Sequence, residues 1–166
     1  MKKTDNIIAI DPDVGKSGVA FLHTSTKQLE VSSFTIDQLL DYFEYIKEQQ
    51  KKTNESVVIV VEASWNTTHN HHLSSKHTLQ SASKTGYNIG RNHQQGMVIC
   101  EISKKMGFEV VEQPPLRKYW KGVNGKITHE ELSYFTGLTG RTNQEERDAA
   151  LIAWNYANFP IRIKKF

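Results

Sequence analysis

Two acidic side chains stand at the points where apolar segments of this sequence end. Asp11 follows the apolar run Ile7–Ile10, and Glu62 follows the β-branched run Val57–Val61. We expect both runs to be buried strands, because continuous apolar runs of this length are typical of strands covered on both faces. If these strands are parallel neighbours, their carboxylates emerge at the same edge of the sheet, where the ligands of open sheets bind.

Two further acids lie on the last predicted helix, at about residues 144–157. Glu145 and Asp148 are three positions apart and therefore share one helix face. The small residues Ala149 and Ala150 allow this helix to approach the sheet closely. Carboxylates from two strand ends and one helix suit Mg²⁺, which prefers oxygen ligands. Two such ions about 3.5–4 Å apart activate water and stabilise the leaving oxygen in phosphodiester cleavage.

The pattern of apolar residues predicts the elements that position these acids. Strands are expected near 7–11, 19–23, 29–34, 57–61 and 108–111, and helices near 36–51, 87–106, 129–135 and 144–157. The turn with Gly15 and Gly18 is expected to join the first two strands as a hairpin. Residues 63–85, rich in Ser, Thr, Asn and His, are expected to form a long loop. Strands followed by alternating helices and strands indicate a mixed sheet with helices packed on it.

The composition restricts the class of protein. The 166 residues, 37% hydrophobic and 23% charged, fit a single domain, 1–166, with a buried core. No apolar run is long enough to span a bilayer and the start is too short for a signal peptide, so we expect no membrane partner and a cytoplasmic location. The single cysteine, Cys100, excludes an internal disulfide framework and a cysteine-rich zinc site.

Positive charge is concentrated in two segments, although the net charge is only +3. Residues 104–126 and 161–166 contain the basic residues Lys104, Lys105, Arg117, Lys118, Lys121, Lys126, Arg162, Lys164 and Lys165. The aromatic residues Tyr119 and Trp120 lie inside the first segment. This distribution fits a nucleic-acid-binding surface, and charge alone does not separate such a surface from an ordinary solvated one.

Five segments, taken in order, resemble the RuvC family of Holliday-junction resolvases, which are nucleases of the RNase H-like superfamily. The segments are Ile7–Gly18 for the opening hairpin, Val57–Glu62 for the second acidic strand, Ile89–Gly96 for the central helix, Pro114–Lys126 for the basic phosphate-contacting segment and Glu145–Ala153 for the terminal acidic helix. Each motif is weak by itself. The ordered set covers nearly the whole chain.

The resemblance implies an α/β fold with an RNase H-like mixed five-stranded sheet and helices on both faces. It implies a crossover junction endodeoxyribonuclease, which is a Mg²⁺-dependent, structure-selective endonuclease that cleaves four-way DNA junctions in recombination and repair. Two ions per active site are expected, with Mn²⁺ as a substitute and without a nucleotide cofactor. Symmetric incision of branched DNA needs two active sites, so we expect a homodimer, with the helix at 87–106 as its interface.

The resemblance assigns the catalytic and metal-binding acids as Asp11, Glu62, Glu145 and Asp148, with Glu146 as a competitor for the position of Glu145. Trp65 resembles an aromatic wedge at the branch point of the junction, where a ring stacks on an unpaired base; the alternative is a core tryptophan. Asp13 stands where the family usually has glycine, and aspartate tolerates a left-handed backbone better than most residues.

The basic DNA contacts follow from the same resemblance. Arg117 matches one family lysine by its distance from Gly122, and Lys118 adjoins it. The second lysine position falls at His129, so Lys121 or Lys126 is an alternative for that contact.

The sequence excludes some other classes of protein and leaves two open. An actin-like ATPase also opens with an aspartate and glycines on a hairpin, but it needs two lobes, and 166 residues hold one. A P-loop at Gly15–Ser17 fails because its upstream glycine position is Ile10. A related nuclease acting on other branched DNA or on RNA–DNA hybrid stays open, as does a non-catalytic nucleic-acid-binding module. The histidines within 69–77 are spaced irregularly, which favours a polar DNA-facing loop over a zinc site.

Overall fold

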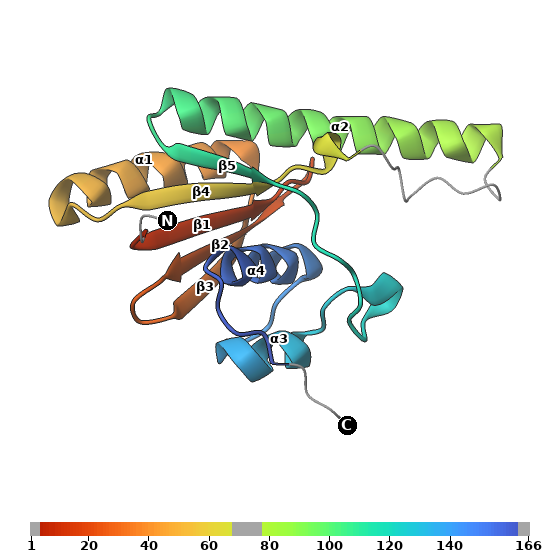
Figure 1. Cartoon of the computed structure of the whole chain (residues 1–166). Coiled ribbons are helices and arrows are strands. Elements are labelled where there is room, and N and C mark those ends of the chain that lie inside the picture. Colours follow the sequence, from red (N-terminus) through yellow and green to blue (C-terminus); the bar gives the residue numbers. More distant parts are fainter. Residues whose placement is uncertain (1–3, 68–77, 163–166) are drawn as a thin grey trace.

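The computed structural model describes residues 4–67 and 78–162, and this part of the chain contains a five-stranded sheet (Figure 1). The elements are β1 Asn6–Asp11, β2 Ser17–His23, β3 Gln28–Phe34, α1 Ile36–Thr53, β4 Val57–Glu62, η1 Ser64–Asn66, α2 Leu79–Lys105, β5 Glu109–Gln113, η2 Val123–Gly125, α3 His129–Thr136 and α4 Gln144–Tyr156. The strand order is β3-β2-β1-β4-β5. The β1–β2 and β2–β3 pairs are antiparallel, and the β1–β4 and β4–β5 pairs are parallel.

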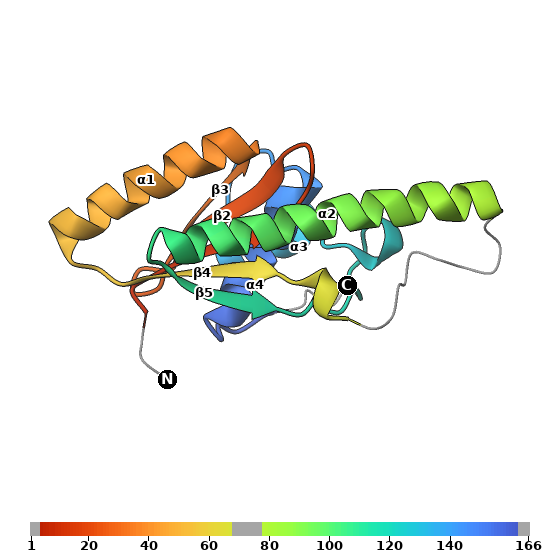
Figure 2. The ribbon, with the colours of Figure 1, turned by 90° about the horizontal axis from the view of Figure 1, so that it is seen from above.

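Helices cover both faces of this mixed sheet because its central strands are apolar on both sides. Ile7 and Ala9 of β1 pack with α4 and α3, whereas Ile8 and Ile10 pack with α1 and α2. Figures 1 and 2 show α4 on one face of the sheet and α1 and α2 on the other. The predicted α/β fold, a mixed five-stranded sheet with helices on both faces, is therefore confirmed. No described helix is long and apolar enough to cross a bilayer.

The predicted start of the helix at 87–106 is wrong. The helix α2 begins at Leu79, after the N-cap Thr78, whose hydroxyl accepts a hydrogen bond from the Ser81 backbone N–H at 3.2 Å. The buried residues of α2 lie in its second half, between Gly96 and Ser103, and the first half projects beyond the sheet (Figure 1). Because the projecting half packs against no described core, it carries no apolar period that a sequence could show.

The long loop predicted for residues 63–85 is correspondingly shorter. A single 3₁₀ turn, η1, occupies its start, and α2 occupies its end. Residues 68–77, including the histidines discussed above, lie outside the described residues.

The helix α4 approaches the sheet closely at Gly18, the residue of β2 that pairs with Asp11. A methyl group on Gly18 would collide with the backbone carbonyl of Glu145 in the first turn of α4. The absence of a side chain at Gly18 therefore allows the acidic end of α4 to reach the ends of the central strands.

We expect Gly18→Ala to lower the melting temperature, because overpacking against a backbone carbonyl typically costs about 1–3 kcal/mol. Thermal unfolding followed by circular dichroism measures this change. Gly86→Ala is the matched control, since a methyl group there meets nothing within 4 Å in α2 and is expected to add about 0.4–1 kcal/mol of stability. Equal melting temperatures for Gly18→Ala and the wild type would contradict the close approach of α4.

Candidate active site

Four of the five acids that line one open pocket of about 230 Å³ come from three elements, β1, β4 and α4; the fifth is Asp13, in the turn after β1. Asp11 and Glu62 end the parallel neighbours β1 and β4, whose pairing of Ile10 with Val61 sets the two carboxylates side by side. Glu145 and Asp148 come from the first two turns of α4, which lies across the sheet. The structure therefore brings together the four acids that the sequence analysis selected.

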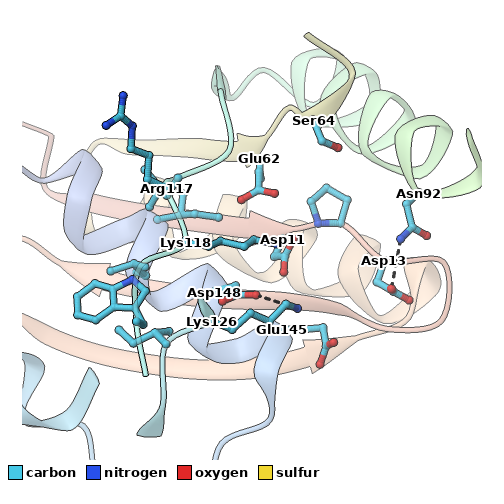
Figure 3. Close-up of a pocket in the computed structure, with 16 residues that line it drawn as sticks. Asp11, Asp13, Glu62, Ser64, Asn92, Arg117, Lys118, Lys126, Glu145 and Asp148 are labelled. Atoms are coloured by element: carbon cyan, nitrogen blue, oxygen red, sulfur yellow. Dashed lines mark hydrogen bonds and ion pairs between the residues drawn. The ribbon is translucent and has the colours of Figure 1, made fainter. Parts of the chain in front are cut away.

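The carboxylates share the pocket without forming a finished metal site. Figure 3 shows Asp11, Glu62 and Asp148 facing a common space, with the carboxylate of Glu145 pointing away from the other three. Among residues 4–67 and 78–162, no three His, Cys, Asp or Glu side chains are arranged to hold a metal ion. The donors suit a hard divalent cation in their chemistry, and side-chain rotation is needed to converge them.

The site concentrates negative charge in a partly buried place. Burial, followed by the negative charges of Glu62 and Asp148, raises the pKa of the Asp11 carboxyl well above its ordinary value. Burial also raises the pKa of Glu62; the positive charge of Lys118 opposes this effect, and Asp148 adds to it. Both shifts mean that the folded protein accommodates these negative charges poorly in the absence of a cation.

Asp148 is the acid whose charge is already offset. Its Oδ2 lies 3.4 Å from Nζ of Lys126, and its Oδ1 accepts a hydrogen bond from Nε2 of Gln144 at 2.8 Å. Lys126 is presented by a tight loop in which the Gly122 N–H donates to the Lys126 carbonyl at 2.9 Å. This loop turns through Asn124 and Gly125, which have φ angles of 57° and 72°.

The two candidates for the fourth acid, Glu145 and Glu146, are placed differently. Glu146 accepts a hydrogen bond from the Ser33 hydroxyl at 2.9 Å and another from the Asn143 backbone N–H at 3.0 Å. The bond from Asn143 completes the capping box of α4, and both bonds hold Glu146 away from the pocket. The side chain of Glu145, in contrast, lines the pocket.

The predicted basic contacts divide into two groups. Arg117, Lys118 and Lys126 line the pocket, whereas Lys121 and His129 lie outside it. The two ring nitrogens of His129 lie 3.0 Å from the Thr142 hydroxyl and 3.2 Å from the Ser133 hydroxyl. This placement favours Lys126 over His129 as the residue that takes the place of the second phosphate-contacting lysine.

Trp65 also lies outside the pocket. Its indole packs with the apolar residues beneath α1 and α2, and a methyl group on Gly96 would collide with the ring. The ring of His93 is 6.5 Å away at a steep angle. These contacts are those of a partly buried structural residue, and a DNA-stacking role for Trp65 stays a prediction.

Two features of the pocket were not selected from the sequence. Asp13 does not adopt a positive φ; its carboxylate accepts hydrogen bonds from the Gly15 backbone N–H at 2.9 Å and from Asn92 of α2 at 3.4 Å (Figure 3). Trp120 is 7% exposed and stacks on Tyr119, and its indole N–H has no hydrogen-bond partner within the described residues. Nothing in the sequence indicated that the indole N–H of Trp120 would line this pocket, apart from the position of Trp120 in the basic segment.

No family model and no curated protein matches this sequence. The following three are among the solved structures that are similar to it. RuvC of Thermus thermophilus in complex with Holliday junction substrate has 15% identity and a TM-score of 0.48, covering 92% of each chain. The T. thermophilus RuvC structure has 16% identity and a TM-score of 0.48, covering 92% of this chain and 93% of the other. Fowlpox virus resolvase with Holliday junction DNA has 10% identity and a TM-score of 0.43, covering 92% and 97%.

Neutralising Asp11 is expected to stabilise the protein in EDTA, because Asp11→Asn removes a buried charge that faces Glu62 and Asp148. A gain of about 1 kcal/mol raises the melting temperature of a chain of this size by about 2–4 °C. Mg²⁺ is expected to raise the melting temperature of the wild type and to have a much smaller effect on Asp11→Asn. A lower melting temperature for Asp11→Asn in EDTA would show that its carboxylate stabilises the fold instead.

Proposed function

We propose that this protein is a metal-dependent nuclease that cleaves four-way DNA junctions. The observation that carries the proposal is the single pocket in which the carboxylates of β1, β4 and α4 lie beside Arg117, Lys118 and Lys126. Metal-dependent cleavage of a phosphodiester uses carboxylates that bind divalent metal ions. It also uses basic side chains that bind the phosphates of the DNA.

Asp11, Glu62 and Asp148 would hold the divalent cations, with Glu145 completing the set after a side-chain rotation. Mg²⁺, or Mn²⁺ in its place, would supply the charge stabilisation that a phosphodiester needs as its bond to the leaving oxygen breaks, and two ions per site are proposed. The carboxylate types and their raised pKa values support this assignment, since a cation relieves the repulsion between Asp11 and its neighbours.

The chain's own cations would bind and orient the phosphate. Lys126 is paired with Asp148 in the structure, at 3.4 Å, and the arrival of a substrate phosphate would give its amine a second acceptor. Release of Asp148 from Lys126 would then free that carboxylate for a metal ion. Lys118 lies near Glu62, and its ammonium group would bind the oxygens of the neighbouring phosphate. The indole N–H of Trp120, which has no hydrogen-bond partner in the described part of the chain, is suited to donate to an oxygen in the same pocket.

The choice of a four-way junction as substrate rests on the ordered sequence motifs that resemble the RuvC family. The same resemblance supports a homodimer, because symmetric incision of a junction needs two copies of the pocket. Size-exclusion chromatography with light scattering, on the protein alone and with junction DNA, measures the oligomeric state.

The function is tested by incubating the purified protein with labelled four-way junction, linear duplex and RNA–DNA hybrid, in Mg²⁺ or in EDTA. We expect Mg²⁺-dependent cleavage of the junction and a loss of about 100-fold or more in the Asp11→Asn, Glu62→Gln and Asp148→Asn variants, with junction binding retained. The carboxylates hold cations and do not contact DNA directly, which is why binding is expected to survive.

Glu145→Gln and Glu146→Gln form a matched pair for this assay. The first removes a carboxylate from the pocket, and the second removes one from the capping box outside it. We expect a large loss of cleavage only in Glu145→Gln. Binding without cleavage in any metal would support a non-catalytic module, and cutting of the hybrid alone would assign a different substrate.

Neutralising the basic segment is expected to weaken binding to all branched DNAs alike. In Arg117→Gln/Lys118→Gln/Lys121→Gln, each lost phosphate contact lowers the log–log salt slope of binding by about 0.9. Fluorescence anisotropy at several salt concentrations measures the slope. Lys51→Gln/Lys52→Gln, in the last turn of α1, is the control with the same kind of charge removed elsewhere. Identical slopes for the triple variant and the wild type would mean that the segment does not contact DNA.

A further inference from the structure

A second pocket lies at the opposite ends of β1 and β4 from the acids. It has a volume of about 290 Å³ and is lined by α1 together with the starts of both strands. Its aromatic side chains are Phe21, Tyr42 and Tyr45, and its carboxylates are Glu30 and Glu55. Of the described residues that line it, none is a lysine or an arginine.

Asn6 gives this pocket a buried acceptor without a donor. Asn6 is 3% exposed and lies at the same face of β1 as Ile8 and Ile10, two and four residues further along, so its side chain points to the face that carries α1. Its Nδ2 donates to Oε2 of Glu55 at 2.9 Å, which fixes the orientation of the amide. The Oδ1 atom is then left buried with no hydrogen-bond partner among the described residues. Such an atom is costly unless a ligand or water supplies the donor.

The other polar groups of the pocket are neutral or negatively charged: Gln49, Gln50, Thr53 and the two tyrosines are neutral, and the two carboxylates are its only charged groups among the described residues. Burial, followed by the negative charge of Glu30, raises the pKa of Tyr42, so its ring stays neutral at physiological pH. Tyr45 is 55% exposed and offers an accessible ring at the rim. Glu55 lies 3.6 Å from Nε2 of His23, and Glu30 accepts a hydrogen bond from Gln28 at 3.3 Å. Aromatic faces and carboxylates together attract cations, and the buried amide oxygen requires that the cation carry N–H donors.

We propose that this pocket binds a guanidinium group on an alkyl chain, supplied either as a small molecule or as an arginine side chain of a partner protein. A planar guanidinium presents several N–H donors at once and stacks on an aromatic ring. It can therefore donate to Oδ1 of Asn6 and to a carboxylate while it lies against Tyr42 or Tyr45. An ammonium group is a more compact and more strongly hydrated charge, and it suits this flat, aromatic site less well.

The proposal is tested by a titration of the full-length, isotope-labelled protein, followed by the NMR signal of the Asn6 side-chain amide and the backbone signals of α1. Ethylguanidinium is compared with N-ethylurea, which has nearly the same shape and no charge, and with ethylammonium, all at constant ionic strength. We expect saturable shifts with ethylguanidinium and binding at least about fivefold weaker for the other two compounds. Equal binding of ethylguanidinium and N-ethylurea, or no saturable shift, would overturn the proposal and leave water as the partner of Asn6.

Matched variants locate the binding within the pocket. Tyr45→Ala and Glu30→Gln are expected to weaken ethylguanidinium binding by at least about fivefold. Tyr87→Ala, which removes a tyrosine that is 66% exposed on α2, and Glu44→Gln, on α1 outside the pocket, are expected to leave binding unchanged. Unaltered affinity in both pocket variants would refute the assignment.

The tripeptide acetyl-Gly-Arg-Gly-amide separates the two sources of the guanidinium group. Binding at least as tight as that of ethylguanidinium supports an arginine side chain of a partner. Binding of ethylguanidinium with exclusion of the tripeptide supports a small-molecule ligand.

Discussion

The candidate active site depends on the parallel pairing of β1 with β4. Side chains alternate along a strand, so a slip of one residue would turn Asp11 and Glu62 to opposite faces. Both faces of these strands are apolar, and hydrophobicity alone does not choose between the two registers. The two faces differ in shape instead. Ala9 and Ala20 pack with the alanine-rich α4, whereas the larger side chains of Ile8 and Ile10 pack with α1 and α2. Close packing of α4 therefore favours the register that aligns the two acids.

The same close packing makes the charge of the site tolerable. The first turn of α4 meets β2 at Gly18, which brings the partial positive charge of a helix N-terminus toward the ends of β1 and β4. Lys118 and Lys126 add full positive charges from the loop after β5. Burial still raises the pKa values of Asp11 and Glu62, so these contributions offset the repulsion only in part. A site that retains unbalanced negative charge is suited to bind further cations.

The sequence was sufficient for the acids and insufficient for their surroundings. Asp11 and Glu62 were recognisable because an apolar run stops abruptly at each, and Asp148 because a run of small and apolar residues follows it. Residues 79–86 of α2 were missed because the start of this helix has no packing face and hence no period. The contact of His129 with Thr142 and the contact of Trp65 with Gly96 depend on how separate segments of the chain meet. Only tertiary packing determines such contacts.

The two pockets lie at opposite ends of one strand, and this arrangement bears on how independent they are. Asn6 and Asp11 are the first and last residues of β1, and at about 3.3 Å per residue their backbones are separated by roughly 16 Å. Effects of substitutions more than about 7–10 Å apart usually add when the sites share no partner. The described side chains that line the two pockets do not overlap, but both pockets rest on the β1–β4 ladder. A ligand at Asn6 can therefore influence Asp11 only by stabilising that ladder as a whole, which changes the stability of the fold more than the geometry of the acids.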